Sequence, residues 1–512
     1  MKTANDIRNL LRKGEKIDLE CKEADKQVPR SIYETYSSFA NTDGGTILLG
    51  VQEDKDAKDP TKRFRIIGVA DQEKLISDFW NTINGSKVNV NILIDENVYP
   101  LEVDGLPIVV IDVPRADYMM RPVHTGENPF KGSFKRNHEG DYHCSEAEVR
   151  SMIRDQNESG NDSLLLDLYT MDDIDLETLH RYRNRFRVVN EDSVWNALPD
   201  KDFLEMLGGY RYDRRKKVEG LTMAGLLMFG KGLPIRDVFN MINMDYREET
   251  DVSFDVRWND RVTYDGSWEN NLFNFIQKVM PKLTADLPKP FRMEGILRED
   301  DTQLHKACRE AMINMIIHAD FQGEGTLKVI KHRDYFEFTN PGILKIPKEM
   351  IYRGGNSRAR NPRMQIMLRM IGYGDTAGSG FPTILAAWRN KGWPEPELEE
   401  DTILNQVTLI LKMNSNESDE GQGVSHCING TQSGTQFGTQ SGTQFGTQSE
   451  DEEYKAQILS MIKANNKITR QQIAGALSVS LRTAQRMLKS IDGLKYIGSG
   501  RGGHWEYNGE DE

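Results

Sequence analysis

The sequence contains few cysteines and no long apolar run. Its four cysteines (Cys21, Cys144, Cys308 and Cys427) are scattered over 512 residues without paired spacing. Neither a disulfide framework nor a zinc ribbon is therefore expected, and a reducing compartment fits best. No stretch of about 18 apolar residues is present to span a bilayer, and the N-terminus lacks the apolar core of a signal peptide. We expect a soluble, cytoplasmic protein without a membrane partner.

The chain also lacks an overall positive charge. Its formal net charge of -13 argues against a protein that coats nucleic acid uniformly, but a sum over the whole chain hides local patches. A length of 512 residues exceeds what one hydrophobic core supports, and about one domain per 150 residues gives roughly three to four domains. We therefore predict an α+β multidomain protein whose charge must be analysed segment by segment.

Residues 414–450 have the composition of a flexible linker. Five copies of the tetrapeptide Gly-Thr-Gln-Ser/Phe begin at Gly430, and such a segment cannot bury enough apolar area to offset its backbone entropy. A linker of this kind lets the last domain move independently. The alternative, a self-associating repeat, has only Phe437 and Phe445 as aromatic residues.

Residues 451–512 have the pattern of a winged helix-turn-helix. Apolar residues recur at helical spacing around Ile458 and Ile462, and Thr469 and Ser480 are placed as N-caps of two further helices. After Gly493 the sequence predicts two short strands around a Gly-rich tip. Three helices followed by a hairpin predict a winged helix.

The charge of this last segment is opposite to that of the whole chain. Residues 454–507 contain nine Lys or Arg against Asp492 and Glu506, a local charge of +7. On the third predicted helix one face carries three cations, and the predicted wing carries a fourth: Arg482, Arg486, Lys489 and Arg501. This arrangement predicts DNA binding through a groove-reading helix and a phosphate or minor-groove contact. Use of the winged helix for protein contacts alone is the alternative.

The first 155 residues alternate helical and strand patterns. A helix is expected from Thr3 to Lys13, followed by an extended IDLECKEA segment, a helix in RSIYETYSSFANT and a buried strand in TILLGVQED. The motifs Glu20-Cys21-Lys22, Phe39-Ala40-Asn41-Thr42-Asp43-Gly44-Gly45, Gly50-Val51 and Ile67-Gly68-Val69 follow Glu15 along the chain. In this combination the segment resembles the Schlafen-type AlbA domain, an α/β module.

That resemblance implies a nucleic-acid-binding role and a candidate metal site. In the Schlafen nucleases three acidic side chains of this module bind a divalent metal and cut structured RNA, the first two lying five residues apart. Glu15 and Glu20 match that spacing, Glu53 takes the third position with Asp54 as its alternative, and Lys22 would steady a phosphate. Clustered carboxylates suit Mg or Mn, which generate a nucleophilic hydroxide. Binding of RNA or DNA without cleavage is the other interpretation.

A helical pattern in LHKACREAMINMIIHADF carries two polar residues on one face, Glu310 and Asn314. Downstream, Asn340-Pro341-Gly342 follows a strand pattern, and Gly378-Ser379-Gly380 opens a helix whose N-terminus can hold phosphate. In this order the motifs resemble the N box and Gly boxes of the GHKL ATPase superfamily, an α/β sandwich.

The GHKL resemblance implies that Asn314 coordinates Mg, that Glu310 activates water, and that the two Gly motifs hold ATP. The adenine-reading Asp of the superfamily is replaced by Asn340, which puts adenine recognition in question. His318 and Asp320 either line a lid or end the helix.

These patterns predict five segments. They are an AlbA module (1–155), a connecting α/β region (156–290), a GHKL-like ATP-binding module (291–413), the linker (414–450) and the winged helix (451–512). We predict a nucleotide-responsive nucleic-acid-binding protein, a homo-oligomeric transcriptional regulator that binds DNA through the winged helix and ATP with Mg or Mn. The alternative is a metal-dependent endonuclease of the Schlafen type acting on RNA or DNA, and weak ATPase activity is open in either case.

Overall fold

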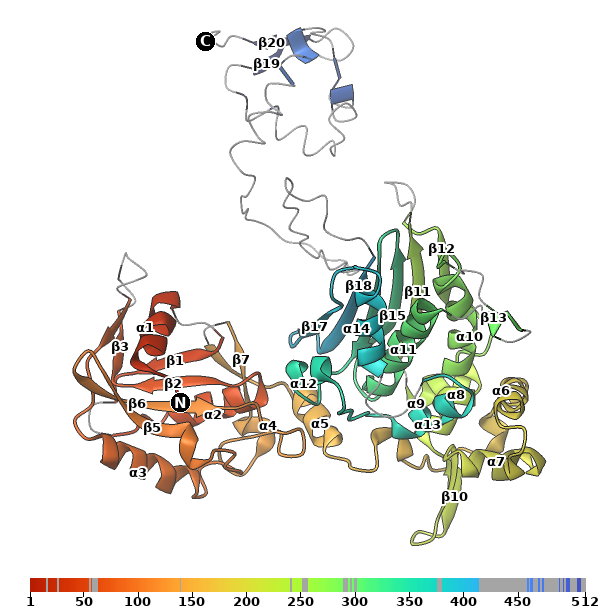
Figure 1. Ribbon diagram of the computed structural model, residues 1–512, viewed down its shortest axis with the longest axis horizontal. Helices are drawn as coiled ribbons and strands as arrows, with labels where there is room; N and C mark the ends of the chain where they lie inside the picture. The colour runs from red at the N-terminus through yellow and green to blue at the C-terminus, as the bar shows by residue number, and fades with distance from the viewer. Residues whose placement is uncertain are drawn as a thin grey trace. The chain divides into compact units, whose positions relative to one another are not determined.

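The computed structural model forms two units, residues 1–422 and 423–512 (Figure 1). In the first unit it describes residues 1–14, 17–24, 27–54, 57, 63–138, 140–239, 242–250, 257–288, 293–294, 297–298, 302–374 and 380–413. In the second unit it describes residues 458–459, 461–463, 468–469, 472–473, 488, 491, 494–497 and 504–507. None of the helices so described is long and apolar enough to cross a membrane.

A four-stranded sheet of order β1-β2-β6-β5 forms the centre of residues 1–155, the N-terminal module. Its strands are β1 (Leu19–Lys22), β2 (Gly45–Leu49), β5 (Val98–Val103) and β6 (Leu106–Val113), of which only β1 and β2 run parallel. Successive side chains of a strand face opposite sides of a sheet. Ile47 and Leu49 accordingly pack in one hydrophobic cluster and Leu48 in another. Both faces of the sheet are therefore buried.

Helices cover the two faces of this sheet. They are α1 (Ala4–Lys13), which contributes Ile7 and Leu11 to one cluster, and α2 (Ile32–Asn41) and α3 (Gln72–Ile83), which contribute to the other. The remaining elements are α4 (Pro129–Gly132), α5 (Glu146–Asp155) and the hairpins of β3 (Val51–Glu53) with β4 (Phe64–Ile66) and β7 (Phe134–Asn137) with β8 (Gly140–His143). The expected opening helix, second helix and flanking strands are confirmed.

Residues 156–239 form helices around one hairpin. The elements are α6 (Leu176–Val189), α7 (Asp200–Met206), β9 (Tyr210–Asp213), β10 (Val218–Leu221), α8 (Met223–Phe229) and α9 (Gly232–Val238). Every residue of α8 is buried. Helix α8 packs in the same hydrophobic core as the module that follows, so this region and that module are built together.

A six-stranded sheet of order β12-β11-β15-β16-β18-β17 organises residues 242–413, the large-sheet module. Its strands are β11 (Ile242–Glu249), β12 (Asp260–Thr263), β15 (Gly325–His332), β16 (Tyr335–Pro341), β17 (Glu397–Asp401) and β18 (Gln406–Lys412). Only the β11–β15 pair is parallel. Strands β11 and β12 precede residue 291, so part of the region expected to connect the modules adds two strands to this sheet.

Helices pack on one face of the large sheet (Figure 1). They are α10 (Leu272–Leu283), α11 (Gln303–His318) and α14 (Gly380–Arg389), and the shorter elements of the module are β13 (Met293–Glu294), β14 (Leu297–Arg298), α12 (Lys348–Arg353) and α13 (Pro362–Met370). Leu327, Phe338 and Leu409 of the sheet share one hydrophobic core with Met312 and Ile316 of α11. This packing places α11 over the strand that carries Asn340.

The second unit contains a small hydrophobic cluster and a hairpin. Ile458, Ile462, Ile473, Leu488 and Trp505 pack together, and β19 (Leu494–Ile497) pairs antiparallel with β20 (His504–Tyr507). The two strands expected after Gly493 are confirmed. The predicted linker (414–450) and the predicted DNA-contacting cations Arg482, Arg486, Lys489 and Arg501 lie outside the described residues, so the winged helix stays a prediction.

Candidate nucleotide-binding site

A pocket opens between α11, the large sheet and the segment from α12 to α14. The empty space within it is about 1140 Å³, a volume that includes open solvent at its mouth. Glu310, Asn314, Asn340 and Gly380 all line it. The structure therefore brings residues from three separate sequence motifs to one cavity.

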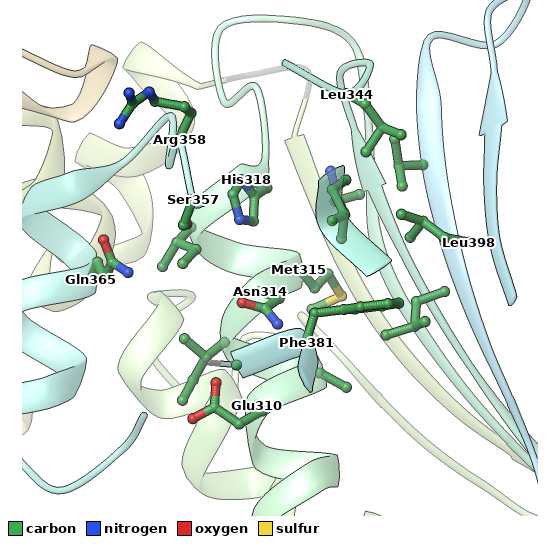
Figure 2. A pocket seen from close by; sticks show the side chains of 18 of the residues that line it. Glu310, Asn314, Met315, His318, Leu344, Ser357, Arg358, Gln365, Phe381 and Leu398 are labelled. Atoms are coloured by element: carbon green, nitrogen blue, oxygen red, sulfur yellow. The ribbon is translucent and has the colours of Figure 1, made fainter. Parts of the chain in front are cut away.

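Helix α11 presents the polar end of the pocket. Thr302 caps the helix by accepting a hydrogen bond from the His305 backbone N–H. Apolar residues on the remaining positions are buried, so Glu310 and Asn314, one turn apart, project toward the cavity (Figure 2). Glu310 is only 9% exposed.

The start of α14 closes on these two side chains. A Cβ built on Gly380 would lie 2.6 Å from Glu310 Oε2 and 3.3 Å from Asn314 Nδ2, so only glycine fits without displacing them. The N-terminus of this ten-residue helix carries a partial positive charge. An amide, a carboxylate and a helix N-terminus together match the chemistry of a phosphate group and its bound Mg²⁺. Gly378 and Ser379 lie outside the described residues.

The opposite end of the pocket is apolar. Phe338, Leu344, Leu398 and other apolar side chains line it, and Figure 2 shows Phe381 lying across the cavity between this end and Glu310. Asn340 is 6% exposed, and its Nδ2 donates to the Pro341 carbonyl at 3.2 Å. An apolar slot with one buried amide suits a planar heterocyclic base.

His318 lines the pocket, whereas Asp320 does not. Burial, with the nearby charges of Arg360 and Lys345, lowers the pKa of His318 to about 4, so its imidazole is uncharged at neutral pH. Asp320 instead accepts hydrogen bonds from Arg154 at 2.6 Å and Ser151 at 2.9 Å. Gly342, with φ +94°, packs against Arg360 and Asp320 rather than lining the cavity.

Helix α13 contributes Gln365 and Arg369 to the pocket. A buried carboxyl group accepts a hydrogen bond from the first turn of this helix. Asp162 is 0% exposed, and its Oδ2 accepts a hydrogen bond from the Met364 N–H at 2.8 Å. Burial raises the pKa of Asp162 to about 7, although hydrogen bonds from the Met364 and Arg363 amides oppose the rise.

The raised pKa of Asp162 predicts a pH dependence of stability. Between about pH 4 and pH 7 the folded protein holds a proton that the unfolded chain has released. The free energy of unfolding therefore falls as pH rises through this window, by up to about 1.4 kcal/mol per pH unit, and levels off above pH 7. Asp162→Asn keeps an acceptor for Met364 and removes the charge, so it should lose this slope. Denaturant unfolding from pH 4 to 8 measures it, with the exposed Asp172→Asn as control; equal slopes for both variants would refute the assignment.

In the N-terminal module the predicted metal ligands are paired with cations. Glu20 lies 2.6 Å from Lys22 Nζ and 2.9 Å from Nη1 of the buried Arg136. Glu53 lies 2.6 Å from Arg63. Glu15 is outside the described residues. Within the described part of the chain no three His, Cys, Asp or Glu side chains form a group that could hold a metal ion.

A buried ionic junction joins the N-terminal module to the wall of the pocket. Arg115 donates to Glu400 at 3.0 and 3.1 Å and to the Leu344 carbonyl at 2.7 Å. Arg121, 2% exposed, donates to the Lys345 carbonyl at 3.1 Å. Leu344 and Lys345 line the pocket, so the two modules touch at its wall.

The same junction extends to helix α5. Arg360, also 2% exposed, makes two bonds of 2.7 Å to the Asp155 carboxylate and one of 2.8 Å to the His318 carbonyl. Burial and neighbouring cations lower the pKa of Arg121 to about 9 and that of Lys345 to about 8. Sequence reasoning missed these residues because the pairs that join the two modules are separated by more than 200 positions, and no local spacing marks them.

Three family models match the chain. Residues 15–145 match the Schlafen AlbA_2 domain, residues 150–245 match a domain of unknown function (DUF8451), and residues 326–411 match the model described as "Putative ATP-dependent DNA helicase recG C-terminal". The chain thus contains a Schlafen AlbA_2 domain and a RecG-type C-terminal ATPase-like domain, which confirms the two resemblances at this level. These are the modules of a nucleic-acid-related, ATP-binding class of protein.

Two solved structures are similar to the chain, one over nearly its whole length and one over about a quarter of it. The DIP2311 protein of Corynebacterium diphtheriae is 17% identical with a TM-score of 0.38, over 96% of this chain and 79% of that one. The N-terminal domain of a "Putative ATP-dependent DNA Helicase RecG-related Protein" of Nitrosomonas europaea is 28% identical with a TM-score of 0.23, over 28% of this chain and 94% of that one. No curated protein matches the chain.

Proposed function

We propose that the chain is a nucleotide-responsive nucleic-acid-binding regulator. In this proposal ATP binds the pocket of the large-sheet module, and the AlbA_2 module and the C-terminal winged helix bind nucleic acid. The observation that carries the proposal is the convergence of Glu310, Asn314, Asn340 and Gly380 on one cavity. Asn314 would hold the Mg²⁺ that neutralises the charge of the phosphates, Glu310 would hold a water molecule beside it, and the apolar end would hold the base.

The ionic junction gives the nucleotide a physical route to the AlbA_2 module. Leu344 and Lys345 form part of the pocket wall, and their carbonyl groups accept hydrogen bonds from Arg115 and Arg121 of that module. Glu400 holds the same wall by accepting from the Leu344 N–H at 2.7 Å. A ligand that moves this part of the pocket wall also changes the hydrogen bonds to Arg115 and Arg121. Nucleotide binding can in this way change the nucleic-acid affinity of the AlbA_2 module.

Loss of the Glu400 charge tests this route. Burial alone would raise the pKa of Glu400, but hydrogen bonds and charge from Arg115 lower it, so the group is ionised and Glu400→Gln weakens its bond to Arg115. We expect ATP to change the nucleic-acid affinity of the wild-type protein about fivefold or more, and the variant to lose most of that change while still binding ATP. Glu399→Gln, at an exposed neighbouring position, is the matched control. Full coupling in Glu400→Gln would contradict the route.

A metal-dependent endonuclease is the second candidate, favoured by the AlbA_2 match and the Glu15/Glu20 spacing. We favour binding because Arg136 and Lys22 already neutralise Glu20 and Arg63 neutralises Glu53. Labelled structured RNA and duplex DNA incubated with Mg²⁺ or Mn²⁺, and with EDTA, separate the two. Metal-dependent cutting that is lost in a Glu15→Ala/Glu20→Ala variant would favour the endonuclease.

A further inference from the structure

The hairpin of β9 and β10 carries a concentrated positive charge at its tip. Between residues 211 and 217 the sequence is RYDRRKK, with five cations and one acid. The five cations are exposed, and none forms an ion pair with another described residue: Arg211, Arg214, Arg215, Lys216 and Lys217. The whole chain has a net charge of -13, so the charge of this patch is opposite in sign to that of the chain.

The one acid of the tip is used to shape the turn. Asp213 Oδ1 accepts hydrogen bonds from the backbone N–H groups of Arg215 at 2.8 Å and Lys216 at 3.1 Å. These bonds lower the pKa of Asp213. Its Cα partner across the hairpin is Val218, and the Lys217 N–H donates to the Asp213 carbonyl at 2.8 Å. The turn therefore holds its cations in a defined loop.

The base of the hairpin is fixed to the core. Tyr210 is 4% exposed and Leu221 is 0% exposed. The Leu221 N–H donates to the Tyr169 carbonyl at 2.9 Å. A Cβ on Gly220 would lie 2.8 Å from the same carbonyl oxygen, so the two backbones pack directly together. Figure 1 shows this hairpin, labelled β10, projecting from the helices around it. A rigid base with an exposed cationic tip is a preorganised arm.

We propose that this arm is a further nucleic-acid contact, beyond the AlbA_2 module and the winged helix, in which the tip cations bind backbone phosphates. Neither the AlbA_2 match nor the RecG-type match includes these residues, and the inference rests on the nucleic-acid-binding part of the proposed function. Tyr212, 45% exposed, presents an aromatic ring among the cations, and rings in such a setting stack on unpaired bases. An anionic membrane is a poorer partner, because interfacial binding needs apolar side chains beside the cations, and residues 211–217 have none besides that tyrosine.

The salt dependence of binding by the full-length protein tests the arm. Each phosphate contact contributes about 0.9 to the slope of log K against log salt on duplex DNA. Arg214→Ala/Arg215→Ala/Lys216→Ala should therefore reduce the slope by about 2 to 3 and weaken binding about tenfold or more at 0.1 M salt. Lys348→Ala/Arg389→Ala/Lys391→Ala, which removes three exposed cations from other elements, should leave the slope unchanged.

Each outcome of this experiment has one meaning. If the wild-type protein binds nucleic acid and the hairpin variant has the same salt slope, the phosphate contact at the hairpin is wrong and the proposed function still stands. Absence of any nucleic-acid binding by the wild-type protein would overturn both. The proposal would also be wrong if the wild-type protein bound vesicles of anionic phospholipid, the hairpin variant lost that binding, and the variant still bound DNA and RNA like the wild type. Thermal unfolding and ATP binding by the variant check that it is folded.

Discussion

Replacement of Asn314 by Ala should lower ATP affinity about 30- to 100-fold, roughly 2 to 3 kcal/mol of binding free energy. The reason is geometric. Asn314 projects from α11 into the polar end of the pocket, close to the start of α14, where a Cβ on Gly380 would lie 3.3 Å from its Nδ2. Its removal takes away the amide that we assign to the phosphates and their Mg²⁺.

Isothermal titration of ATP into the variant measures this loss. The control is Asn184→Ala on α6, an exposed helical asparagine that should leave affinity unchanged. A second variant, Gly380→Val, introduces a side chain within 2.6 Å of Glu310 Oε2 and should weaken binding at least as much. Wild-type affinity in both variants would show that the nucleotide does not occupy this end of the pocket.

Replacement of Arg360 by Met should lower the free energy of unfolding by about 3 to 5 kcal/mol. Arg360 is 2% exposed and makes a two-bond ion pair with Asp155, which is itself 5% exposed. Without the guanidinium, the Asp155 carboxylate and the His318 carbonyl are left buried without this partner. Such a loss is among the largest that a single substitution produces.

Denaturant unfolding measures this loss, from the unfolding transition of the first unit. Arg150→Met is the matched control, because Arg150 pairs with Glu146 at 3.3 Å on the surface of α5 with both side chains more than half exposed, and such pairs contribute about 0–1 kcal/mol. A double variant, Arg360→Met/Asp155→Leu, should recover part of the loss because it removes both buried charges. Equal effects of the Arg360 and Arg150 substitutions would contradict the buried junction.

Individual helices and strands could be predicted from the sequence where their apolar residues recur with a clear helical or strand period. The 3.6-residue spacing in residues 303–318 predicted α11 and placed Glu310 and Asn314 on one face, and the structure has both. Helices α1 and α2 and strands β1 and β2 of the N-terminal module were predictable from equally clear local patterns, whereas α3, β5 and β6 were not predicted. The motif order also identified two modules that family models match.

Long-range pairing could not be predicted in the same way. Strand β11 lies far from β15 in sequence but pairs with it in parallel, and no local pattern marks such a partner. The Arg360–Asp155 pair joins residues 205 positions apart. Single charged residues such as Arg121 and Glu400 look like surface positions in a sequence, and only the contact between modules buries them. Gly342 is the opposite case. Its sequence motif predicted a place in the pocket, but Gly342 packs outside the pocket against Arg360.

Reciprocal titration of the full-length protein tests the central claim most directly. Nucleic-acid affinity is measured with and without ATP and Mg²⁺, and ATP affinity is measured with and without nucleic acid. A nucleotide-responsive regulator requires the two affinities to change by the same factor, which we predict to be about fivefold or more. Binding of both ligands with no change in either affinity would contradict the account.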